Sequence, residues 1–478
     1  MKHALFLVLA LAAATPATAQ DLRAQVQAKL GEAATGTRFG LVVATEDGTE
    51  ILAIDPDGRY IPASNTKMFS TAVAFATLGD LNQLDEIGGN EVRIEGRDVV
   101  LAGNGDARMS SAADCKIDCL ATLADAVAAK TKRVRDVIGD DTLFPDQRWS
   151  PGMSWNNIPT RSGTGVSALT LDENEVGLTV APGEVGKPAV VTVESPYYTI
   201  DNRTQTVAGA ESKIGYDRLP FERLVRVTGT IGKDARPDLS RMGIDDPAHY
   251  AAWRLKALLE ARGVRVKGEV RVRHRPLMPE DNGPSTRTDP MRMVRADFVP
   301  IAQLIPPPLA EDMKTINKIS QNLHAELTLR RVSGWLGSGS IANGVAEIEK
   351  MLAQAGVART AWDLSDGSGM STYNRVAPRG VVKFLRWIAM QPWGAQWRDT
   401  LPIGGVDGTL RNRFKGTPLE GKIFAKTGTL NATNAVAGYM IAASGKTLTF
   451  AFYANDIPSD ASSSRIMDAA LNIVAAAN

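Results

Sequence analysis

The chain has 478 residues, of which 44% are hydrophobic and 22% are charged, with 54 Lys and Arg against 53 Asp and Glu. This length and composition predict a globular protein of two to four domains. A net charge near zero gives no support for binding nucleic acid or an anionic membrane.

Residues 1–19 have the pattern of a secretory signal peptide. Lys2 and His3 precede an apolar run, residues 4–14, that is too short to span a bilayer, and Ala17-Thr18-Ala19 is a cleavage pattern. A buried N-terminal helix is the alternative. Because no second long apolar run follows, we expect a secreted, periplasmic protein without a transmembrane segment, and its basic and acidic side chains are then equal in number.

A β-hairpin is expected over residues 38–45 and 49–54, around the turn Glu46-Asp47-Gly48. Three further strands are expected near the C-terminus, over residues 422–430, 435–442 and 447–455. A hairpin alone is only marginally stable in water. We therefore expect the hairpin to join these late strands in one sheet.

The first candidate site follows the hairpin. Ser64 precedes Lys67 by three residues, and an apolar run then ends at Gly79, which suits a helix C-terminal cap. Residues three apart share a helix face, so Lys67 lies beside the Ser64 hydroxyl and can take its proton. Taken alone, the pair also fits an N-cap serine and a solvated lysine.

The long stretch between the hairpin and the late strands is interpreted as an insertion. Residues 86–165 and 238–289 mix strands and helices and predict an inserted α/β domain, whereas residues 166–237 predict a small β domain. The sheet-bearing domain is then discontinuous, over residues 20–85 and 290–478.

Cys115 and Cys119 are the two cysteines of the chain. In an exported protein this spacing predicts a local disulfide and a loop rather than a regular helix. The four histidines are scattered along the sequence, so no metal site is expected.

Two later segments offer the partners that an activated serine needs. Lys426-Thr427-Gly428-Thr429 lies in an expected strand, where the lysine and the hydroxyls can hold a carboxylate and the glycine permits close backbone approach. Ser320-Gln321-Asn322, within an expected helix, offers a hydroxyl for proton transfer and an amide. Ser154-Trp155-Asn156 has the same S-x-N pattern; we prefer Ser320 because it follows the insertion.

The ordered set S-x-x-K, S-x-N and K-T-G is the signature of penicillin-binding proteins and serine β-lactamases. Together with the long gap from Lys67 to Ser320, it makes the chain resemble the class C low-molecular-mass penicillin-binding proteins, the D-alanyl-D-alanine carboxypeptidase/endopeptidase family. Further matching segments are Gly139-Asp140-Asp141, Asp366–Ser371 with Asn374-Arg375, and Gly404–Leu410.

The resemblance covers nearly the whole mature chain and implies a fold. That fold is α/β (α+β), of the serine β-lactamase/DD-peptidase (transpeptidase-like) type. It has an antiparallel five-stranded sheet with helices on both faces, interrupted by a large two-domain insertion.

The resemblance also implies an exported serine-type D-Ala-D-Ala carboxypeptidase that acts on peptidoglycan peptides, with endopeptidase action on cross-links as a second activity. Ser64 would form an acyl-enzyme, Lys67 would be its base, and burial beside Lys426 would lower the pKa of Lys67. Ser320 would protonate the leaving amine, and Asn322 would orient Lys67 and the substrate.

In the same family, the residues of the K-T-G strand bind the substrate. Lys426, Thr427, Gly428 and Thr429 would hold the terminal carboxylate, and the backbone N–H groups of Ser64 and Thr429 would form the oxyanion hole. β-Lactams are expected as inhibitors that acylate Ser64. No cofactor is implied.

One departure from the family pattern is Gln321, which stands where aspartate is common; we expect its side chain to point away from the site. Asp366, Ser368 and Arg375 are interpreted first as a turn that braces the site, with a functional role as the alternative. Two other functions remain open: a β-lactamase or esterase on the same fold, and a non-catalytic β-lactam-sensing or wall-binding protein.

Overall fold

A computed structural model of the chain describes residues 19–283 and 299–478. The expected signal peptide lies outside the described residues, apart from Ala19, the first residue of α1 (Ala19–Leu30). Within the described ranges, none of the helices has the length and apolar character needed to cross a membrane.

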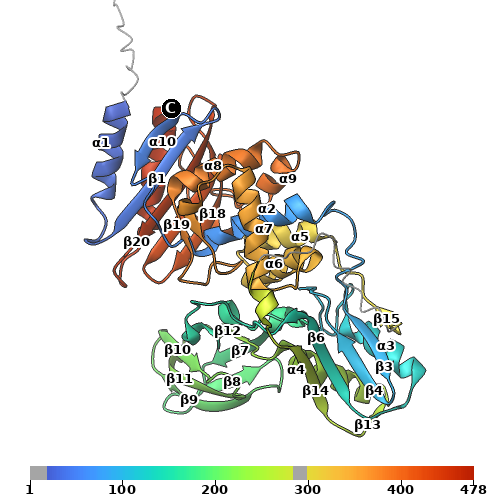
Figure 1. Cartoon of the computed structure of the whole chain (residues 1–478). Coiled ribbons are helices and arrows are strands. Elements are labelled where there is room, and N and C mark those ends of the chain that lie inside the picture. The colour runs from blue at the N-terminus through green and yellow to red at the C-terminus, as the bar shows by residue number, and fades with distance from the viewer. Residues whose placement is uncertain (1–18, 284–298) are drawn as a thin grey trace, which may run out of the picture.

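A five-stranded antiparallel sheet forms the centre of the part that we call the main domain (Figure 1). Its order is β18-β19-β20-β1-β2, so the N-terminal hairpin joins the three C-terminal strands as expected. Strands β1 and β20 pair along their whole length, from Arg38 opposite Asn455 to Thr45 opposite Leu448. The five strands are β1 (Arg38–Thr45), β2 (Glu50–Ile54), β18 (Ile423–Leu430), β19 (Thr433–Ile441) and β20 (Thr447–Asn455).

Helices cover both faces of this sheet because successive strand residues point to opposite sides. Val42 and Ala44 belong to the core with α2 (Lys67–Thr77) and α8 (Pro378–Ala389). Leu41 and Val43 belong to the other core, with α1 and α10 (Ser464–Ala477). The other elements of the main domain are α5 (Leu309–Lys318), α6 (Asn322–Leu336), α7 (Ile341–Gln354), β16 (Trp362–Asp363), β17 (Arg375–Val376) and α9 (Gly394–Asp399).

The inserted region, between α2 and α5, forms the lower half of Figure 1. Its largest sheet has the order β14-β6-β4-β3-β15, with α3 and α4 packed on it, and two three-stranded sheets have the orders β12-β7-β8 and β10-β11-β9. The helices are α3 (Leu120–Lys130) and α4 (Pro247–Ala261). The strands are β3 (Glu91–Glu95), β4 (Asp98–Ala102), β5 (Arg133–Val134), β6 (Val137–Pro145), β7 (Glu175–Ala181), β8 (Val190–Val193), β9 (Thr199–Val207), β10 (Ser212–Asp217), β11 (Leu224–Gly232), β12 (Asp238–Gly243), β13 (Arg265–Val266), β14 (Val270–Arg275) and β15 (Ala302–Gln303).

Two strands pair across the boundaries that the sequence pattern placed at residues 237 and 289. Strand β12 starts at Asp238 and pairs with β7 of the small β sheets, and β15 follows residue 289 but pairs with β3. One continuous hydrophobic core includes Leu101 of the α/β part and Val227 of the β part. A composition-based boundary misses this because the two parts share a core.

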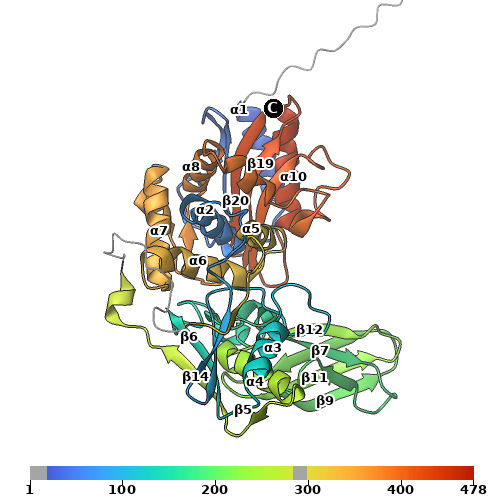
Figure 2. The same ribbon diagram turned by 90° about the vertical axis from the view of Figure 1, so that its right-hand side faces the viewer.

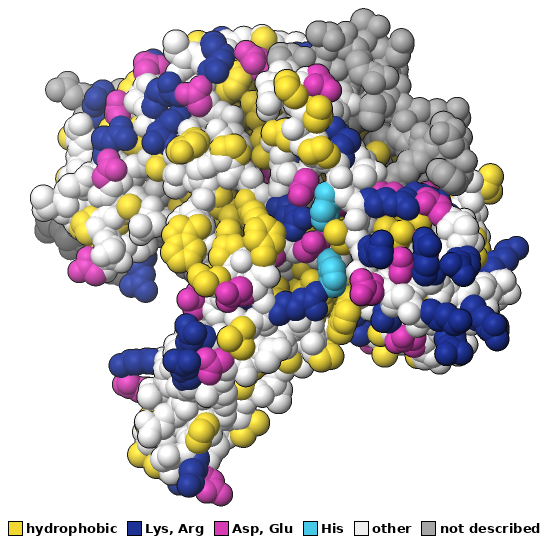
Figure 3. Space-filling view, turned by 60° about the horizontal axis from the view of Figure 1, so that its bottom comes forward, with side chains coloured by type: hydrophobic (Ala, Val, Ile, Leu, Met, Phe, Trp, Pro, Cys, Tyr) yellow, Lys and Arg dark blue, Asp and Glu magenta, His cyan; other side chains and the backbone are white. Residues whose placement is uncertain are grey.

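The two cysteines form the expected disulfide, Cys115–Cys119. The bridge closes a loop directly before α3, whose N-terminal cap is Cys119. Figure 2 shows the main domain above and the inserted region below, with the helices α5 and α6 at their junction. On the face that Figure 3 shows, Lys and Arg side chains are mixed with Asp and Glu, and apolar side chains gather near the centre of the view.

Candidate active site

Ser64 lies in a 3₁₀ turn, Ala63–Thr66, that runs directly into α2. The cap residue of this turn is Pro62, so Ser64 is near the helix start as expected but is not its cap. Ala63 has a left-handed φ of +48°, a conformation that costs free energy in a non-glycine residue and persists only where neighbours enforce it. Gly369 packs there so closely that a Cβ on it would lie 1.9 Å from the Ala63 carbonyl oxygen.

Lys67 is fully buried and reaches three oxygen atoms. Its Nζ lies 2.9 Å from Ser64 Oγ, 2.7 Å from Asn322 Oδ1 and 2.6 Å from the carbonyl oxygen of Ser368. The last two can only accept hydrogen bonds. A neutral amine would donate its two N–H groups to them and leave its lone pair directed at the Ser64 hydroxyl, which is the geometry of a general base.

Burial lowers the pKa of Lys67 to about 7. The charges that act on it are the carboxylates of Asp366 and Glu326, which raise the pKa and so oppose part of the burial effect. The sequence predicted that burial and Lys426 would both lower this pKa. Burial is the largest cause, and the repulsion between the charged forms of Lys67 and Lys426 acts on both residues. At neutral pH a large fraction of Lys67 is therefore free to accept a proton.

Ser320 lies in a break between two helices rather than within one. Helix α5 ends at Lys318 and α6 begins at Asn322, so the prediction of one continuous helix here is wrong. Ser320 has a left-handed φ of +65°, and its Oγ lies 2.9 Å from Lys426 Nζ. The break turns the hydroxyl toward the K-T-G strand, which a regular helix would not do.

Lys426 is fully buried on the edge strand β18. Its Nζ donates to Ser320 Oγ at 2.9 Å and to the carbonyl oxygen of Thr427 at 3.0 Å. Burial, and next the positive charge of Lys67, lower its pKa well below the usual value. Thr427 Oγ1 donates to Thr409 Oγ1 at 2.7 Å, and Thr429 is exposed on the same strand.

Gly428 allows β18 to lie against the turn that carries Ser64. A Cβ at this position would lie 2.5 Å from the Pro62 carbonyl oxygen and 3.1 Å from the Ser64 backbone nitrogen. The neighbouring Asn65 donates from Nδ2 to the Lys426 carbonyl oxygen at 2.7 Å. The glycine therefore makes room for the serine's own backbone as well as for a ligand.

Asp366 and Ser368 form the turn that braces Lys67. Asp366 accepts hydrogen bonds from the backbone N–H groups of Gly369 at 2.9 Å and Ser371 at 2.6 Å, while the Ser368 carbonyl accepts from Lys67. Arg375 donates to backbone carbonyl oxygens of Thr372 and Asn374. These contacts fit the bracing interpretation of the three residues.

The other S-x-N segment stands apart from this cluster. Ser154 Oγ bonds Asn156 Oδ1 at 2.5 Å, within its own exposed loop of the inserted region. In contrast, Lys67 Nζ contacts both Ser64 and Asn322, and Lys426 Nζ contacts Ser320. The hydrogen bond from Asn65 to the Lys426 carbonyl oxygen joins these two groups.

Sequence reasoning missed three residues of the site. Asn65 ties the turn to β18, Ser162 of the inserted region accepts from Asn322 Nδ2 at 2.9 Å, and Glu326 acts on Lys67. Glu326 follows Asn322 by four residues, a spacing that places both on one helix face. That spacing was the one available signal; Ser162 had none.

The fold and this cluster define a serine peptidase of the penicillin-binding class, because sheet, insertion and the serine–lysine arrangement occur together. The model of the protein family described as "D-Ala-D-Ala carboxypeptidase 3 (S13) family" matches residues 22–477 of this chain. The chain is 32% identical over 457 residues to the D-alanyl-D-alanine carboxypeptidase of Actinomadura sp. (strain R39), a match that covers 90% of this chain and 80% of the relative.

Solved structures show the same fold. Penicillin binding protein 4 (dacB) from Haemophilus influenzae superposes with a TM-score of 0.77 at 20% identity, over 94% of this chain and 98% of that one. The crystal structure of that protein complexed with a β-lactam gives a TM-score of 0.71 at 20% identity with the same coverage. The chain belongs to the D-Ala-D-Ala carboxypeptidase S13 family and is a serine-type hydrolase of that family.

Proposed function

We propose that Ser64 is the nucleophile of this D,D-carboxypeptidase and that Lys67 is its base. The observation that carries this is the surroundings of Lys67 Nζ, where two acceptors take both N–H groups of a neutral amine and Ser64 Oγ lies at 2.9 Å. A serine is a poor nucleophile unless a base takes its proton. The pKa of about 7 lets Lys67 do so at neutral pH.

The reaction proceeds through an acyl-enzyme. As Ser64 Oγ attacks the carbonyl between the two D-alanines, its proton passes to Lys67. The C–N bond then breaks as Ser320, whose Oγ lies 2.9 Å from Lys426 Nζ, gives its proton to the departing amine and takes up the proton that Lys67 had accepted. Lys67, neutral again, accepts a proton from the water that attacks the ester, and returns it to Ser64 Oγ as the ester C–O bond breaks.

The substrate's terminal carboxylate is held by Lys426, Thr427 and Thr429, with Gly428 leaving room at the strand edge. Burial lowers the pKa of Lys426 and so favours its neutral form, whereas only its ammonium form attracts an anion. The bound carboxylate itself favours the protonated form. The backbone N–H groups of Ser64 and Thr429 are proposed to bind the oxyanion, since Gly428 brings the two backbone segments together.

The substrate is the peptide of peptidoglycan, encountered in the periplasm after export, with D-alanyl cross-links as targets of a second, endopeptidase activity. β-Lactams, which mimic the D-alanyl-D-alanine end, are proposed to acylate Ser64. Slow release of the β-lactam acyl group is supported by one of the two nearby carboxylates, Asp366, whose two oxygens accept from the backbone N–H groups of Gly369 at 2.9 Å and Ser371 at 2.6 Å. Glu326 Oε1 accepts from the backbone N–H groups of Gly367 at 3.0 Å and Ser368 at 2.8 Å, whereas its buried Oε2 has no hydrogen-bond partner among the described residues. The rate at which the label is lost therefore decides between a peptidase and a β-lactamase.

The test uses the mature protein, a labelled penicillin and a peptide ending in D-alanyl-D-alanine. We expect persistent labelling of Ser64 and release of alanine. Ser64→Ala should abolish both, a loss of at least about a thousandfold, whereas Ser154→Ala should leave both unchanged. Rapid loss of the label would identify a β-lactamase, and absence of any label would exclude the catalytic proposal.

A further inference from the structure

The second motif is held from the inserted region as well as from the main domain. Gln321 Nε2 donates to Glu173 Oε2 at 2.7 Å, and Asn322 Nδ2 donates to the Ser162 carbonyl oxygen at 2.9 Å. Gln321 is 5% exposed. Its side chain, which the sequence predicted to point away from the site, makes a specific contact with the inserted region.

Glu173 is presented by a strained loop. Asp172, Glu173 and Asn174 have φ values of +52°, +54° and +53°, a run of left-handed conformations that non-glycine residues rarely adopt. Strain of this kind persists where the surroundings enforce it and is common at functional positions. The left-handed conformation of this loop therefore indicates that contacts with its surroundings hold it in place.

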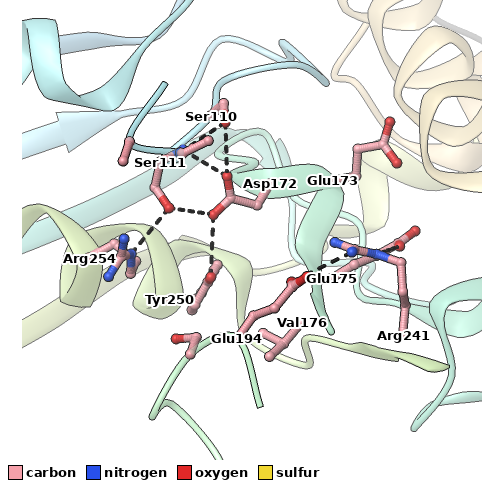
Figure 4. A pocket seen from close by; sticks show the side chains of 13 residues that line it. Ser110, Ser111, Asp172, Glu173, Glu175, Val176, Glu194, Arg241, Tyr250 and Arg254 are labelled. Atoms are coloured by element: carbon pink, nitrogen blue, oxygen red, sulfur yellow. Dashed lines mark hydrogen bonds and ion pairs between the residues drawn. The ribbon is translucent and has the colours of Figure 1, made fainter. Parts of the chain in front are cut away.

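The two neighbours of Glu173 fix the loop from the side of the inserted region. Asp172 accepts from the Ser111 backbone N–H at 2.7 Å and from the Ser111 hydroxyl at 2.6 Å, and buried Asn174 donates from Nδ2 to the Gly165 carbonyl oxygen at 2.9 Å. Ser111, Asp172 and Glu173 line a cavity of about 530 Å³. Figure 4 shows Asp172 directed toward Ser110 and Ser111, while the Glu173 carboxylate points away from them toward the helices of the main domain.

On the side of the main domain, Glu173 lies beside a buried cation, His324. Glu173 Oε1 lies 3.3 Å from His324 Nε2, and His324 Nδ1 lies 2.8 Å from Asp312 Oδ1. These carboxylates raise the pKa of His324 to about 9 despite its burial, so it is protonated at neutral pH. Arg108 of the inserted region then donates from Nε to Asp312 Oδ1 at 2.8 Å. Charges alternate across the boundary, directly beside α6.

Gln321 transmits this contact to the motif. Its Oε1 accepts from the Leu323 N–H at 3.2 Å and caps α6, whose first residue is Asn322, while its Nε2 is held by Glu173. Ser320, the preceding residue, has the left-handed φ that directs its hydroxyl to Lys426. A displacement of Gln321 therefore moves both of its neighbours.

We propose that Glu173 of the inserted region is a positioning residue that, through Gln321, fixes Ser320 and Asn322 against Lys426 and Lys67. The inference rests on the proposed function, because it assigns a task to the same site. It gives the insertion a part in catalysis: the catalytic geometry is completed only when the inserted region is docked.

The main variants change this one hydrogen bond from both sides. Gln321→Glu keeps an oxygen for the Leu323 N–H but places a carboxylate against Glu173, and Glu173→Ala removes the acceptor. Each should lower kcat and the acylation rate constant with labelled penicillin by about tenfold or more, with KM within about threefold, because misplaced groups slow the chemical steps. Glu173→Gln, which can still accept from Gln321, should stay within about threefold of the wild type.

The exchanged pair Glu173→Gln with Gln321→Glu restores a donor opposite an acceptor and should recover activity to within about threefold, a coupling that independent sites do not show. Glu194→Gln is the matched control. Glu194 lines the same cavity, and it accepts from the Gly177 N–H at 2.9 Å and pairs with Arg241, both within the inserted region. Thermal unfolding is followed for every variant.

Unchanged kcat and acylation in folded Glu173→Ala and Gln321→Glu would overturn the proposal. A lower melting temperature with unchanged kcat would do the same, since it would mark a purely structural contact. If a single variant does not fold, the exchanged pair decides, because a folded but inactive exchanged pair contradicts positioning. A wild-type protein that neither takes the label nor releases alanine would overturn the proposed function and this inference together, whereas normal wild-type turnover with insensitive variants overturns the inference alone.

Discussion

The site contains two buried lysines, each 2.9 Å from a serine hydroxyl, in opposite electrostatic surroundings. Lys67, beside Ser64, has two carboxylates near it, Asp366 and Glu326, which raise its pKa against the effect of burial. Lys426, beside Ser320, has instead the positive charge of Lys67, which lowers its pKa further.

The difference shows how one residue type can perform two tasks. Desolvation lowers the pKa of both lysines, and the neighbouring charges then make the two pKa values differ. The pKa of Lys67 is kept close to neutral pH, where a general base works best. Lys426 is left without a resident counter-charge among its described contacts, so the carboxylate of an arriving substrate can supply it.

The largest expected effect comes from exchanging each lysine for arginine. Arginine stays protonated and cannot act as a base, so Lys67→Arg should lower the acylation rate constant by about a thousandfold or more. Lys426→Arg keeps a cation for the carboxylate and should cost about tenfold, mainly in KM. Stopped-flow labelling with penicillin measures both. Equal losses for the two variants would contradict the division of tasks.

Lys426→Ala should lower kcat/KM for a peptide ending in D-alanyl-D-alanine by about a hundredfold, because the substrate carboxylate loses its charged partner. A peptide that ends in D-alaninamide has no such carboxylate. Its kcat/KM should already be low in the wild type and should change by less than about threefold in the variant. A full hundredfold loss on the amide would show that Lys426 acts on the chemical step instead.

Gly428→Ala tests the contact between the two lysine-bearing segments. The added Cβ would meet the Pro62 carbonyl oxygen at 2.5 Å, so β18 has to move away from Ser64 and acylation should slow by about tenfold. Gly215→Ala is the control: this strand glycine of the inserted region has its nearest neighbour at 3.7 Å. A wild-type acylation rate in Gly428→Ala would mean that the spacing is not critical.

The smallest expected effect is a shift of the pH profile. The neutral fraction of Lys67 grows as pH rises through its pKa of about 7, so the acylation rate constant should rise with pH and level off above it. Glu326→Gln removes a charge that raises this pKa and should move the profile to lower pH by about half a unit. The control Glu349→Gln changes an exposed residue paired with Arg359 and should not shift it. A shift to higher pH would contradict the assignment.

The sequence was sufficient for the architecture of the main domain. The hairpin at residues 38–54 needed partners, and the three strands expected near the C-terminus were predicted to supply them; β1 indeed pairs with β20. Lys426 and Gly428 were recognisable because their chemistry is local to one strand.

The second motif was less predictable because its geometry depends on distant contacts. The helical pattern around Ile319 and Leu323 gave no sign of a break, and the left-handed φ of Ser320 depends on packing that no local propensity encodes. The bond from Gln321 to Glu173 joins residues 148 positions apart. The opposing charges around Lys67 and Lys426 likewise emerge only from the folded arrangement.

The pairing of β1 with β20 also sets an order in time. Strand β1 is made early, but one of its two neighbours in the sheet, β20, is the last strand of the chain, and β18 with Lys426 comes only shortly before it. The core of the inserted region, in contrast, is drawn from residues between Val92 and Leu304 and can be complete while the main sheet still waits for its partners. We therefore expect Ser64 to stay unreactive through most of the synthesis of the chain and to become reactive only when the C-terminal strands join the sheet.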